Sequence, residues 1–440
     1  MSRSLVAVLI GTFTLRFSTG ITGGLLVYYL ANLPAHGGPS VDPLALGILA
    51  ATFYAAELIL ATPFGLLSDR FGHHRLMQVG PIFGIVAVVV TWSTTNLVLL
   101  GGTRVLEGSS TAVSVPSILG FIALATAGDE QLRGRIAARF EAATIAGLGA
   151  GFVVAGPLWA VLGPVGFLLN AGIYAISFSI YRFGVEEPPH ATAARASHPG
   201  ISRYGAILRS SNIWLLAPTW IAVNATLSLY TSQTLFQLVK EPNPKFANQM
   251  LMGGFDPVEV SAGLLLGLAV FFGGLLFWGN RFRRFRRTTI ILFGIVGGAV
   301  LVACAFLLNH STGLPLAVQG AEVAGLGIGL FVLAGATPAA LGLLADVTES
   351  FPNDRGAIMG LYSVFLGVGQ IAGSLIGGGA AEVRGLDGVF VATVVFLVVA
   401  LVPLLHLRSV EHLVGADPAA GAEDRSKMSA AGGSEGEAGP

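Results

Sequence analysis

The sequence is poor in charge and in cysteine. Only 11% of its 440 residues are charged, whereas soluble domains contain about 25%. Cys304 is the single cysteine, so no disulfide bond can form within the chain. Basic and acidic residues balance at 24 each, which argues against a nucleic-acid partner. The sequence has no phosphate-binding loop, nucleophile–base pair or dinucleotide fingerprint, so we predict neither enzyme activity nor a cofactor.

Long apolar runs occupy most of the chain. Hydrophobic residues make up 53% of it, and the mean hydropathy is +0.76. A helix that crosses ~30 Å of hydrocarbon needs about 20 mostly apolar residues. The first run lacks a small-residue cleavage site, so we interpret it as a spanning helix and not as a removable signal peptide. We predict an all-α polytopic membrane protein with twelve transmembrane helices, which begin near Leu5, Leu44, Met77, Leu97, Arg135, Val165, Ile213, Val260, Thr288, Leu314, Gly356 and Val389.

The distribution of basic residues predicts the topology. Nineteen of the 24 lysines and arginines fall in the termini or in the connections between spans that would lie on the same side of the membrane as the termini. By the positive-inside rule this side is cytoplasmic, so we expect both termini there, in a multi-pass protein of the plasma or inner membrane. A stretch rich in Pro, Ala and Ser divides the chain. We predict a six-helix half at 1–185, a cytoplasmic linker at 186–211, a second six-helix half at 212–410 and a disordered tail at 411–440.

The two predicted halves resemble each other in sequence. Asp42-Pro43 precedes a span in the first half, and Asp256-Pro257 precedes one in the second. Six helices repeated in the same orientation, around a site near the middle of the membrane, are typical of transporters that work by alternating access. A second stretch matches in the order of its glycines, which are Gly147, Gly151 and Gly156 in the first half and Gly369, Gly373 and Gly378 in the second.

A short polar loop, GLLSDRFGHHR at residues 65–75, lies between the second and third predicted spans. It resembles the signature loop of the major facilitator superfamily, whose members contain two repeated halves. The segment RVLEG, from Arg104 to Gly108 in span four, resembles the partner signature of that family. The resemblance covers the whole chain and implies the major facilitator fold. The segment GLGAGFVVAGP in span five resembles the motif of proton-driven antiporters, here at Gly147, Gly151, Gly156 and Pro157.

The signature loop supplies candidate residues for a conformational latch, namely Gly65, Asp69, Arg70, Gly72 and Arg75. The resemblance implies that Asp69 accepts hydrogen bonds from the start of span eleven, at Arg355-Gly356. A helix N-terminus favours negative charge there. The resemblance also implies that an acid at the end of span four, Asp129 or Glu130, holds Arg70. The alternative is a solvated turn that only orients the chain.

Five charged residues fall inside the predicted spans: Arg16, Glu57, Arg104, Glu107 and Glu322. A charge at the middle of the bilayer costs ~2.5–3.5 kcal/mol, and here two arginines face three carboxylates. The surplus acid would be protonated at rest, as proton coupling requires, so Glu57, Glu107 and Glu322 are the candidates. In the alternative, Arg104 and Glu107 form a static pair one turn apart, and Glu322 reaches an outer vestibule.

Polar residues in span seven predict a substrate cavity between the halves. Arg16 has two open interpretations: contact with an anionic substrate, or a structural pair with Glu57 or Glu107. The pair His73-His74 and the distant His406 and His412 have no spacing that suits tetrahedral ligation, so we predict no metal site. The candidates for the cavity wall are Arg16, Arg104, Asn224, Tyr230, Gln233, Tyr362 and Gln370.

These features together predict a secondary active transporter that works by alternating access and exports small amphiphilic compounds in exchange for protons. Uptake of a sugar, an organic acid or another small metabolite is the alternative within transport. A membrane sensor or a non-transporting scaffold on the same fold is the alternative of another class, because a fold alone does not define a function. We expect a small-molecule substrate, protons and membrane lipid as partners, no nucleic acid, and function as a monomer.

Overall fold

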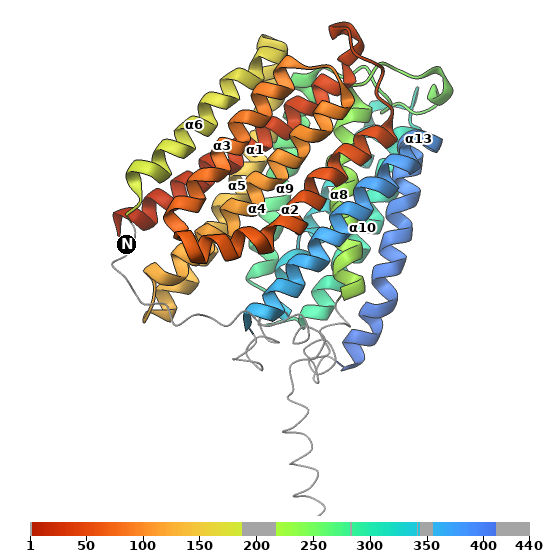
Figure 1. The fold of residues 1–440 in the computed structure, drawn as a ribbon. Coiled ribbons are helices and arrows are strands. Elements are labelled where there is room, and N and C mark those ends of the chain that lie inside the picture. Colours follow the sequence, from red (N-terminus) through yellow and green to blue (C-terminus); the bar gives the residue numbers. More distant parts are fainter. Residues whose placement is uncertain (1, 187–216, 282–283, 341, 344–354, 411–440) are drawn as a thin grey trace, which may run out of the picture.

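The computed structural model describes residues 2–186, 217–281, 284–340, 342–343 and 355–410, without the side chains of residues 130, 355–362 and 410. Within these ranges the chain is a bundle of helices with no strand (Figure 1). Three short 3-10 helices, η1 Leu33–His36, η2 Gly163–Val165 and η4 Pro244–Phe246, lie in connections between them. The long helices are α1 Arg3–Ala31, α2 Pro43–Phe71, α3 His73–Ser93, α4 Leu97–Ala125, α5 Glu130–Leu162, α6 Gly166–Gly184, α8 Ala217–Val239, α9 Pro257–Gly279, α10 Arg287–Asn309, α11 Leu316–Leu333 and α13 Arg355–Val410.

Ten helical segments among the described residues are long and apolar enough to cross a membrane. One of them, Gln131–Gly184, contains both α5 and α6, and α13 contributes two because it bends at Gly385. The less apolar α8, with 23 residues, is not among the ten. Nine of the predicted spans have a helix that begins within five residues of the predicted start. The predicted starts of spans seven and eleven adjoin residues that the structure does not describe, and span twelve follows the bend of α13 at Gly385. The predicted all-α membrane fold is confirmed, while the number of crossings stays a prediction.

The Asp-Pro pairs that match between the halves begin matching helices, α2 and α9. Asp42 Oδ1 accepts a hydrogen bond from the backbone N–H of Ala45 at 2.6 Å, and Asp256 Oδ1 accepts one from Val258 at 2.8 Å. The proline that follows each aspartate has the backbone angle of a helix and no N–H to leave unpaired. The sequence match is therefore also a match of local structure. The predicted tail and most of the predicted linker lie outside the described residues.

The matched glycines bring helices together within each half. A Cβ added to Gly151 on α5 would lie 2.8 Å from the Cα of Gly20 on α1. A Cβ added to Gly373 on α13 would lie 2.7 Å from the Cα of Ala225 on α8. Because lipid tails are as apolar as the helices, close backbone packing at small residues stabilises helix pairs in a membrane. The pairs α1–α5 and α8–α13 are thus equivalent.

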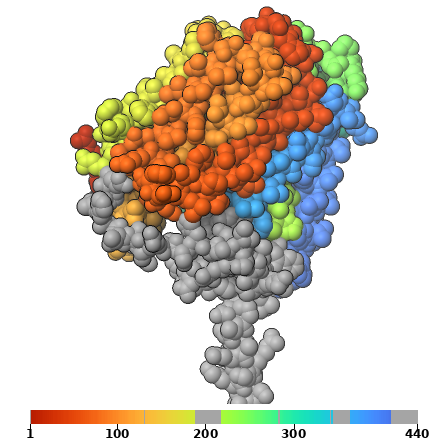
Figure 2. Space-filling model, in the orientation of Figure 1, coloured from red at the N-terminus to blue at the C-terminus, as the bar shows by residue number. Residues whose placement is uncertain are grey.

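The last glycine of each matched set lies between the two halves. Gly156 on α5 faces Pro257 and Ser261 of α9, and Gly378 on α13 faces Pro43 of α2. The helices themselves pack in the same way, α5 against α9 and α2 against α13. Figure 2 shows the seam where the orange surface of the first half meets the blue surface of the second. Two equivalent helix pairs therefore join the halves.

Cross-half hydrogen bonds lie at one end of the bundle, which we call the Lys240 end; the opposite end, which carries the signature loop, is the Asp69 end. Lys240 Nζ donates to the carbonyl oxygen of Val41 at 2.8 Å. Gln233 Nε2 donates to the carbonyl oxygen of Pro43 at 3.1 Å. The Tyr28 hydroxyl donates to the carbonyl oxygen of Pro257 at 3.4 Å. In each case a side chain of one half binds the backbone of the other.

Buried polar side chains hold α1 and α6 together inside the first half. Ser18 Oγ donates to Asn170 Oδ1 at 2.7 Å, and Asn170 Nδ2 donates to Thr22 Oγ1 at 2.8 Å. Farther along, Ser177 Oγ donates to the carbonyl oxygen of Gly11 at 3.1 Å. Satisfied buried hydrogen bonds of this kind restrict the relative position of two helices. The inner faces of α1 and α6 are therefore held in one register.

Substitution of Gly47 tests the contact between α2 and α13. A Cβ at Gly47 would meet Ser374 and Gly378 of α13, whereas one at the exposed Gly102 of α4 has nothing within 4 Å. We expect Gly47→Leu to destabilise the protein by about 1–3 kcal/mol, the usual cost of overpacking. The matched control Gly102→Leu should leave the melting temperature unchanged or raise it, because leucine favours helix. Thermal melting in detergent checks this, and equal melting temperatures for the two variants would contradict the contact.

Candidate functional site

A cluster of charged side chains lies among α1, α2 and α5. The positive charge of Arg16 on α1 acts on two carboxylates, Glu57 on α2 and Glu141 on α5. Arg16 Nη1 also donates a hydrogen bond to Thr111 Oγ1 on α4, at 3.4 Å. Arg16 and Glu57 are half-buried and Glu141 is exposed, so the cluster is accessible from one side. One guanidinium therefore faces two carboxylates.

A second ion pair is buried on α4. Arg104 and Glu107 form a salt bridge one turn apart, and their side chains are only 7% and 1% exposed. The Arg104 guanidinium also lies 6.0 Å from the ring centre of Phe53 on α2. Each charge compensates the other in surroundings where a single charge would be costly. The structure thus sets this pair apart from the Arg16 cluster.

Tyr54 connects the charged cluster to the second half. It lies on α2 one turn before Glu57, and its hydroxyl lies beside Ser228 and Thr231 of α8. Ser228 Oγ in turn donates to the carbonyl oxygen of Gln370 on α13, at 2.8 Å. The Tyr54 hydroxyl of the first half therefore lies beside polar groups that connect α8 and α13 in the second half.

Two of the predicted cavity residues on α8 contact neighbouring helices. Asn224 is buried and faces Gly369 of α13. Gln233 is fully buried and reaches across to Pro43, while its Oε1 has no hydrogen-bond partner among the described residues. An unsatisfied buried acceptor of this kind can bind a donor from a ligand. Gln233 therefore combines a structural contact with free hydrogen-bonding capacity.

Two other candidates lie apart from the charged cluster. The Tyr230 hydroxyl lies beside Thr393 of α13, inside the second half. Glu322 lies on α11, and its Oε2 is buried without a hydrogen-bond partner among the described residues. Among the described residues, neither Tyr230 nor Glu322 forms a hydrogen bond or a salt bridge with Arg16. The side chain of Tyr362 falls outside the described residues.

The signature loop is a tight turn that ends α2 and begins α3. Gly72 joins the two helices with a φ of 95°, a conformation that glycine adopts without strain. Its N–H donates to the carbonyl oxygen of Ser68 at 3.0 Å, and Ser68 Oγ lies 2.6 Å from His73 Nδ1. Asp69 Oδ1 lies 3.8 Å from His73 Nε2. Within the described residues no group of three or more His, Cys, Asp or Glu could hold a metal ion.

The remaining loop residues of the predicted latch lie near the surface. The Arg70 guanidinium is 5.5 Å from the ring centre of Phe71, and Arg75 is exposed at the start of α3. The nearest described side chain to a Cβ at Gly65 is Pro116 of α4, at 3.7 Å. These positions leave both arginines accessible to acidic groups and to anionic lipid.

The predicted latch partners lie at the start of α5 and in the first described residues of α13. Asp129 caps α5, because its Oδ1 accepts a hydrogen bond from the N–H of Leu132 at 2.8 Å. The described part of α13 starts at Arg355, and Gly356 follows it. The side chains of Glu130 and Arg355 fall outside the described residues. The latch contacts themselves stay a prediction.

Lys240, at the end of α8, is a half-buried cation between the halves. Burial lowers the pKa of Lys240 below its ordinary value of 10.5, and the carboxylates of Glu382 on α13 and Asp42 on α2 partly offset this effect. The three residues line a small hollow of about 160 Å³ to which both halves contribute. The strength of this cross-half contact therefore depends on the protonation of one side chain.

Sequence reasoning missed Glu141, Tyr54 and the cross-half role of Lys240. Glu141 lies six residues inside the span that was predicted to begin near Arg135, so its position alone marked it as a charge within the membrane. Tyr54 lies three residues before Glu57 and thus on the same helix face. Lys240 carried no signal beyond its place in a connection, because its contact is made by a distant backbone carbonyl.

The helix bundle, its two equivalent helix pairs and the signature loop together define a transporter fold of the membrane. The family model of the Major Facilitator Superfamily matches residues 8–348. The chain belongs to this family, as the signature loop predicted. It is a multi-pass membrane transporter, and such transporters are not enzymes.

Similar proteins agree on the fold and differ in what they carry. Multidrug resistance protein 2 of Bacillus subtilis (strain 168) is 23% identical over 339 residues, which are 76% of this chain and 79% of that protein. The crystal structure of nucleoside transporter NupG has a TM-score of 0.67 at 15% identity and covers 93% of this chain and 99% of its own. The crystal structure of a mutant of NupG has a TM-score of 0.64 at 14% identity and covers 92% of this chain and 99% of its own. These two structures show the fold alone.

Removal of Glu107 tests whether its pair with Arg104 is structural. We expect Glu107→Gln to destabilise the protein by about 3–5 kcal/mol, because Arg104 would remain buried without a counter-charge. The double variant Arg104→Met, Glu107→Leu removes both charges and should recover most of the stability. Thermal melting in detergent measures both effects. A Glu107→Gln variant as stable as the wild type would show that the pair is dispensable.

The lowered pKa of Lys240 predicts a pH dependence of stability. Between the lowered pKa and 10.5 the folded chain binds fewer protons at this site than the unfolded chain, so the free energy of unfolding rises with pH. The variant Lys240→Met removes the contribution of Lys240 to this pH dependence and leaves the other titrating groups in place. We expect the melting temperature of the wild type, relative to Lys240→Met, to rise as the pH approaches 10.5. A constant or falling difference would contradict this.

Proposed function

We propose that this chain exports small amphiphilic compounds in exchange for protons, by alternating access of its two halves. The observation that carries the proposal is the cluster of Arg16 with Glu57 and Glu141. The likeness to a multidrug resistance protein of Bacillus subtilis supports export. The Gly156-Pro157 motif of span five, with Gly156 in contact with α9, supports coupling to protons.

The charges of the interior do not balance. Arg104 compensates Glu107, and Arg16 can compensate only one of the two carboxylates that face it. A second carboxylate at membrane depth is costly unless it binds a proton or another cation. A proton and a positively charged substrate therefore compete for one site. Competition of this kind produces exchange, because loading one ligand on a given side requires release of the other.

Alternate closure of the two ends opens this site first to one side of the membrane and then to the other. The hydrogen bonds of Lys240, Gln233 and Tyr28 hold the halves together at the Lys240 end. In the proposed cycle these bonds break, and Asp69 then binds the N-terminus of α13 at the opposite end. The Tyr54 contacts with α8 link the charged cluster to this rearrangement.

The positive-inside rule places the Asp69 end in the cytoplasm, together with both termini. The Lys240 end then faces outward, in the plasma or inner membrane. One chain supplies both halves and every residue of the charged cluster, so we propose that the monomer is the functional unit.

Movement of ethidium, a cationic amphiphilic dye, into everted membrane vesicles under an imposed pH gradient tests the proposal. Vesicles without the protein are the control. Accumulation that collapses with an uncoupler is the expected result. Gradient-driven movement of uridine in the opposite direction, without ethidium accumulation, would instead favour uptake of a metabolite. If neither compound moves, but one of them raises the melting temperature, the chain is a binding protein on a transporter fold.

Neutralisation of single carboxylates separates coupling from transport. In Glu57→Gln or Glu141→Gln, Arg16 compensates the carboxylate that remains, so no proton is needed to balance the cluster. We expect each variant to lose ethidium accumulation driven by the pH gradient by at least about tenfold, while downhill ethidium movement remains. Glu259→Gln, at an exposed acid in the first turn of α9, is the control. Wild-type accumulation by both cluster variants would remove them from the coupling mechanism.

A further inference from the structure

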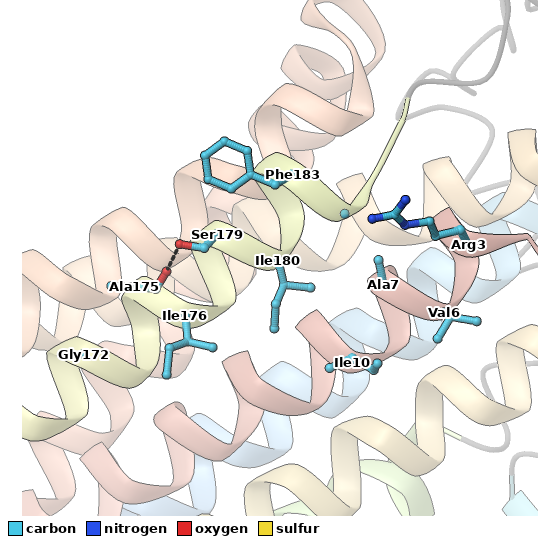
Figure 3. Close-up of a pocket in the computed structure, with 11 residues that line it drawn as sticks. Arg3, Val6, Ala7, Ile10, Gly172, Ala175, Ile176, Ser179, Ile180 and Phe183 are labelled. Atoms are coloured by element: carbon cyan, nitrogen blue, oxygen red, sulfur yellow. Dashed lines mark hydrogen bonds between the residues drawn. The ribbon is translucent and has the colours of Figure 1, made fainter.

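An apolar groove runs along the outside of the first half, between α1 and α6 (Figure 3). Its volume is about 760 Å³. Val6 and Ile10 of α1 and Ile176 and Ile180 of α6 supply most of its walls. The one hydroxyl on its lining, that of Ser179, donates to a backbone carbonyl of its own helix at 2.8 Å, as Figure 3 shows. The groove is therefore apolar along its length.

The groove is a permanent feature of the first half. The hydrogen bonds between the inner faces of α1 and α6 hold the two helices together, and both helices belong to the first half. At one end the helices touch, because a Cβ at Gly184 would lie 2.9 Å from the Cβ of Ala7. At the other end a Cβ at Gly172 has nothing within 4 Å. The groove thus widens from Gly184 toward Gly172.

The length of the groove matches one leaflet of a bilayer. The twelve residue-to-residue steps from Gly172 to Gly184 rise ~18 Å along α6 at about 1.5 Å each. Half of the ~30 Å hydrocarbon core is ~15 Å. Both α1 and α6 belong to segments that are apolar enough to span the membrane, so this face lies among lipid tails. An acyl chain in the groove would reach from the headgroup level to the middle of the bilayer.

Basic side chains lie where the headgroup of such a lipid would lie. Arg3 is exposed at the narrow end of the groove, and Figure 3 shows its side chain there. Arg182 lies in the last turn of α6, with its guanidinium 5.8 Å from the ring centre of Phe183, which also lines the groove. The nearby Glu186 is held by its backbone, whose N–H donates to Ser4 Oγ at 3.1 Å. In the part of the chain that the structure describes, no salt bridge joins Arg3 to an acid.

We propose that the groove between α1 and α6 is a binding site for an anionic phospholipid, with one acyl chain along the groove and the phosphodiester on Arg3. The proposal rests on membership of a membrane family and does not depend on what the protein transports. An anionic headgroup complements Arg3 and Arg182, whereas a zwitterionic headgroup carries its own counter-charge. The apolar groove excludes a soluble anion as the main ligand, because only a lipid occupies both parts of the site.

Native mass spectrometry of the purified protein, with dioleoyl phosphatidylglycerol or dioleoyl phosphatidylcholine added at equal concentration, tests the proposal. We expect the wild type to retain phosphatidylglycerol in preference. Arg3→Gln should weaken that binding about fivefold and leave phosphatidylcholine unchanged, the loss expected for one basic residue at an anionic surface. Gly172→Phe fills the open end of the groove and should weaken the binding of both lipids.

Arg281→Gln is the matched control, since Arg281 is a basic residue at the same end of the bundle but in the second half, 4.7 Å from the ring of Phe277. It should bind both lipids as the wild type does. Melting temperatures without added lipid show whether each variant is folded. Equal retention of the two lipids by the wild type would overturn the proposal. So would an equal loss in Arg281→Gln, an unchanged Gly172→Phe, or displacement of the lipid by inorganic phosphate at the same concentration.

Discussion

Charge held inside a hydrocarbon surrounding is the constraint on which the rest of this structure depends. Each such charge costs ~2.5–3.5 kcal/mol unless a partner compensates it. Arg104 and Glu107 compensate each other within one helix, which makes them a fixed part of the first half. The charge of Arg16 instead acts on carboxylates from two other helices. An odd charge therefore remains among these three helices, and in the proposed cycle a proton or a cationic substrate balances it.

A second constraint acts on how the halves move. Helices in lipid gain little from burying apolar surface against one another, so they pack through close backbone contacts at small residues. Gly151 and Gly373 join helices inside the halves, and Gly156 and Gly378 join helices across them. Contacts across the halves at the Lys240 end are completed by single hydrogen bonds to backbone carbonyls. Few hydrogen bonds need to break before the halves separate there. This suits a protein that alternates between two conformations, each closed at one end of the bundle.

The sequence allowed the helices and the family to be predicted, because both depend on local pattern. Hydropathy located the spans, the Asp-Pro pairs located two helix starts, and the spacing of the signature loop identified the family. The partners of Arg16 could not be derived in this way. The sequence left Glu57 and Glu107 as equal choices, whereas in the structure the charge of Arg16 acts on Glu57 and Glu141. That choice depends on how each helix is rotated about its axis, which tertiary packing decides.

The distance between the halves at the Lys240 end, as a function of pH, tests the central claim most directly. Spin labels at Val98 on α4 and Leu316 on α11, which are 83% and 84% exposed, report this distance when Cys304 is replaced by alanine. Proton-coupled alternation predicts two distances whose populations change with pH. It also predicts that this pH dependence disappears when Glu57 and Glu141 are both replaced by glutamine. A single distance at every pH, or an unchanged pH response in the double variant, would contradict the account.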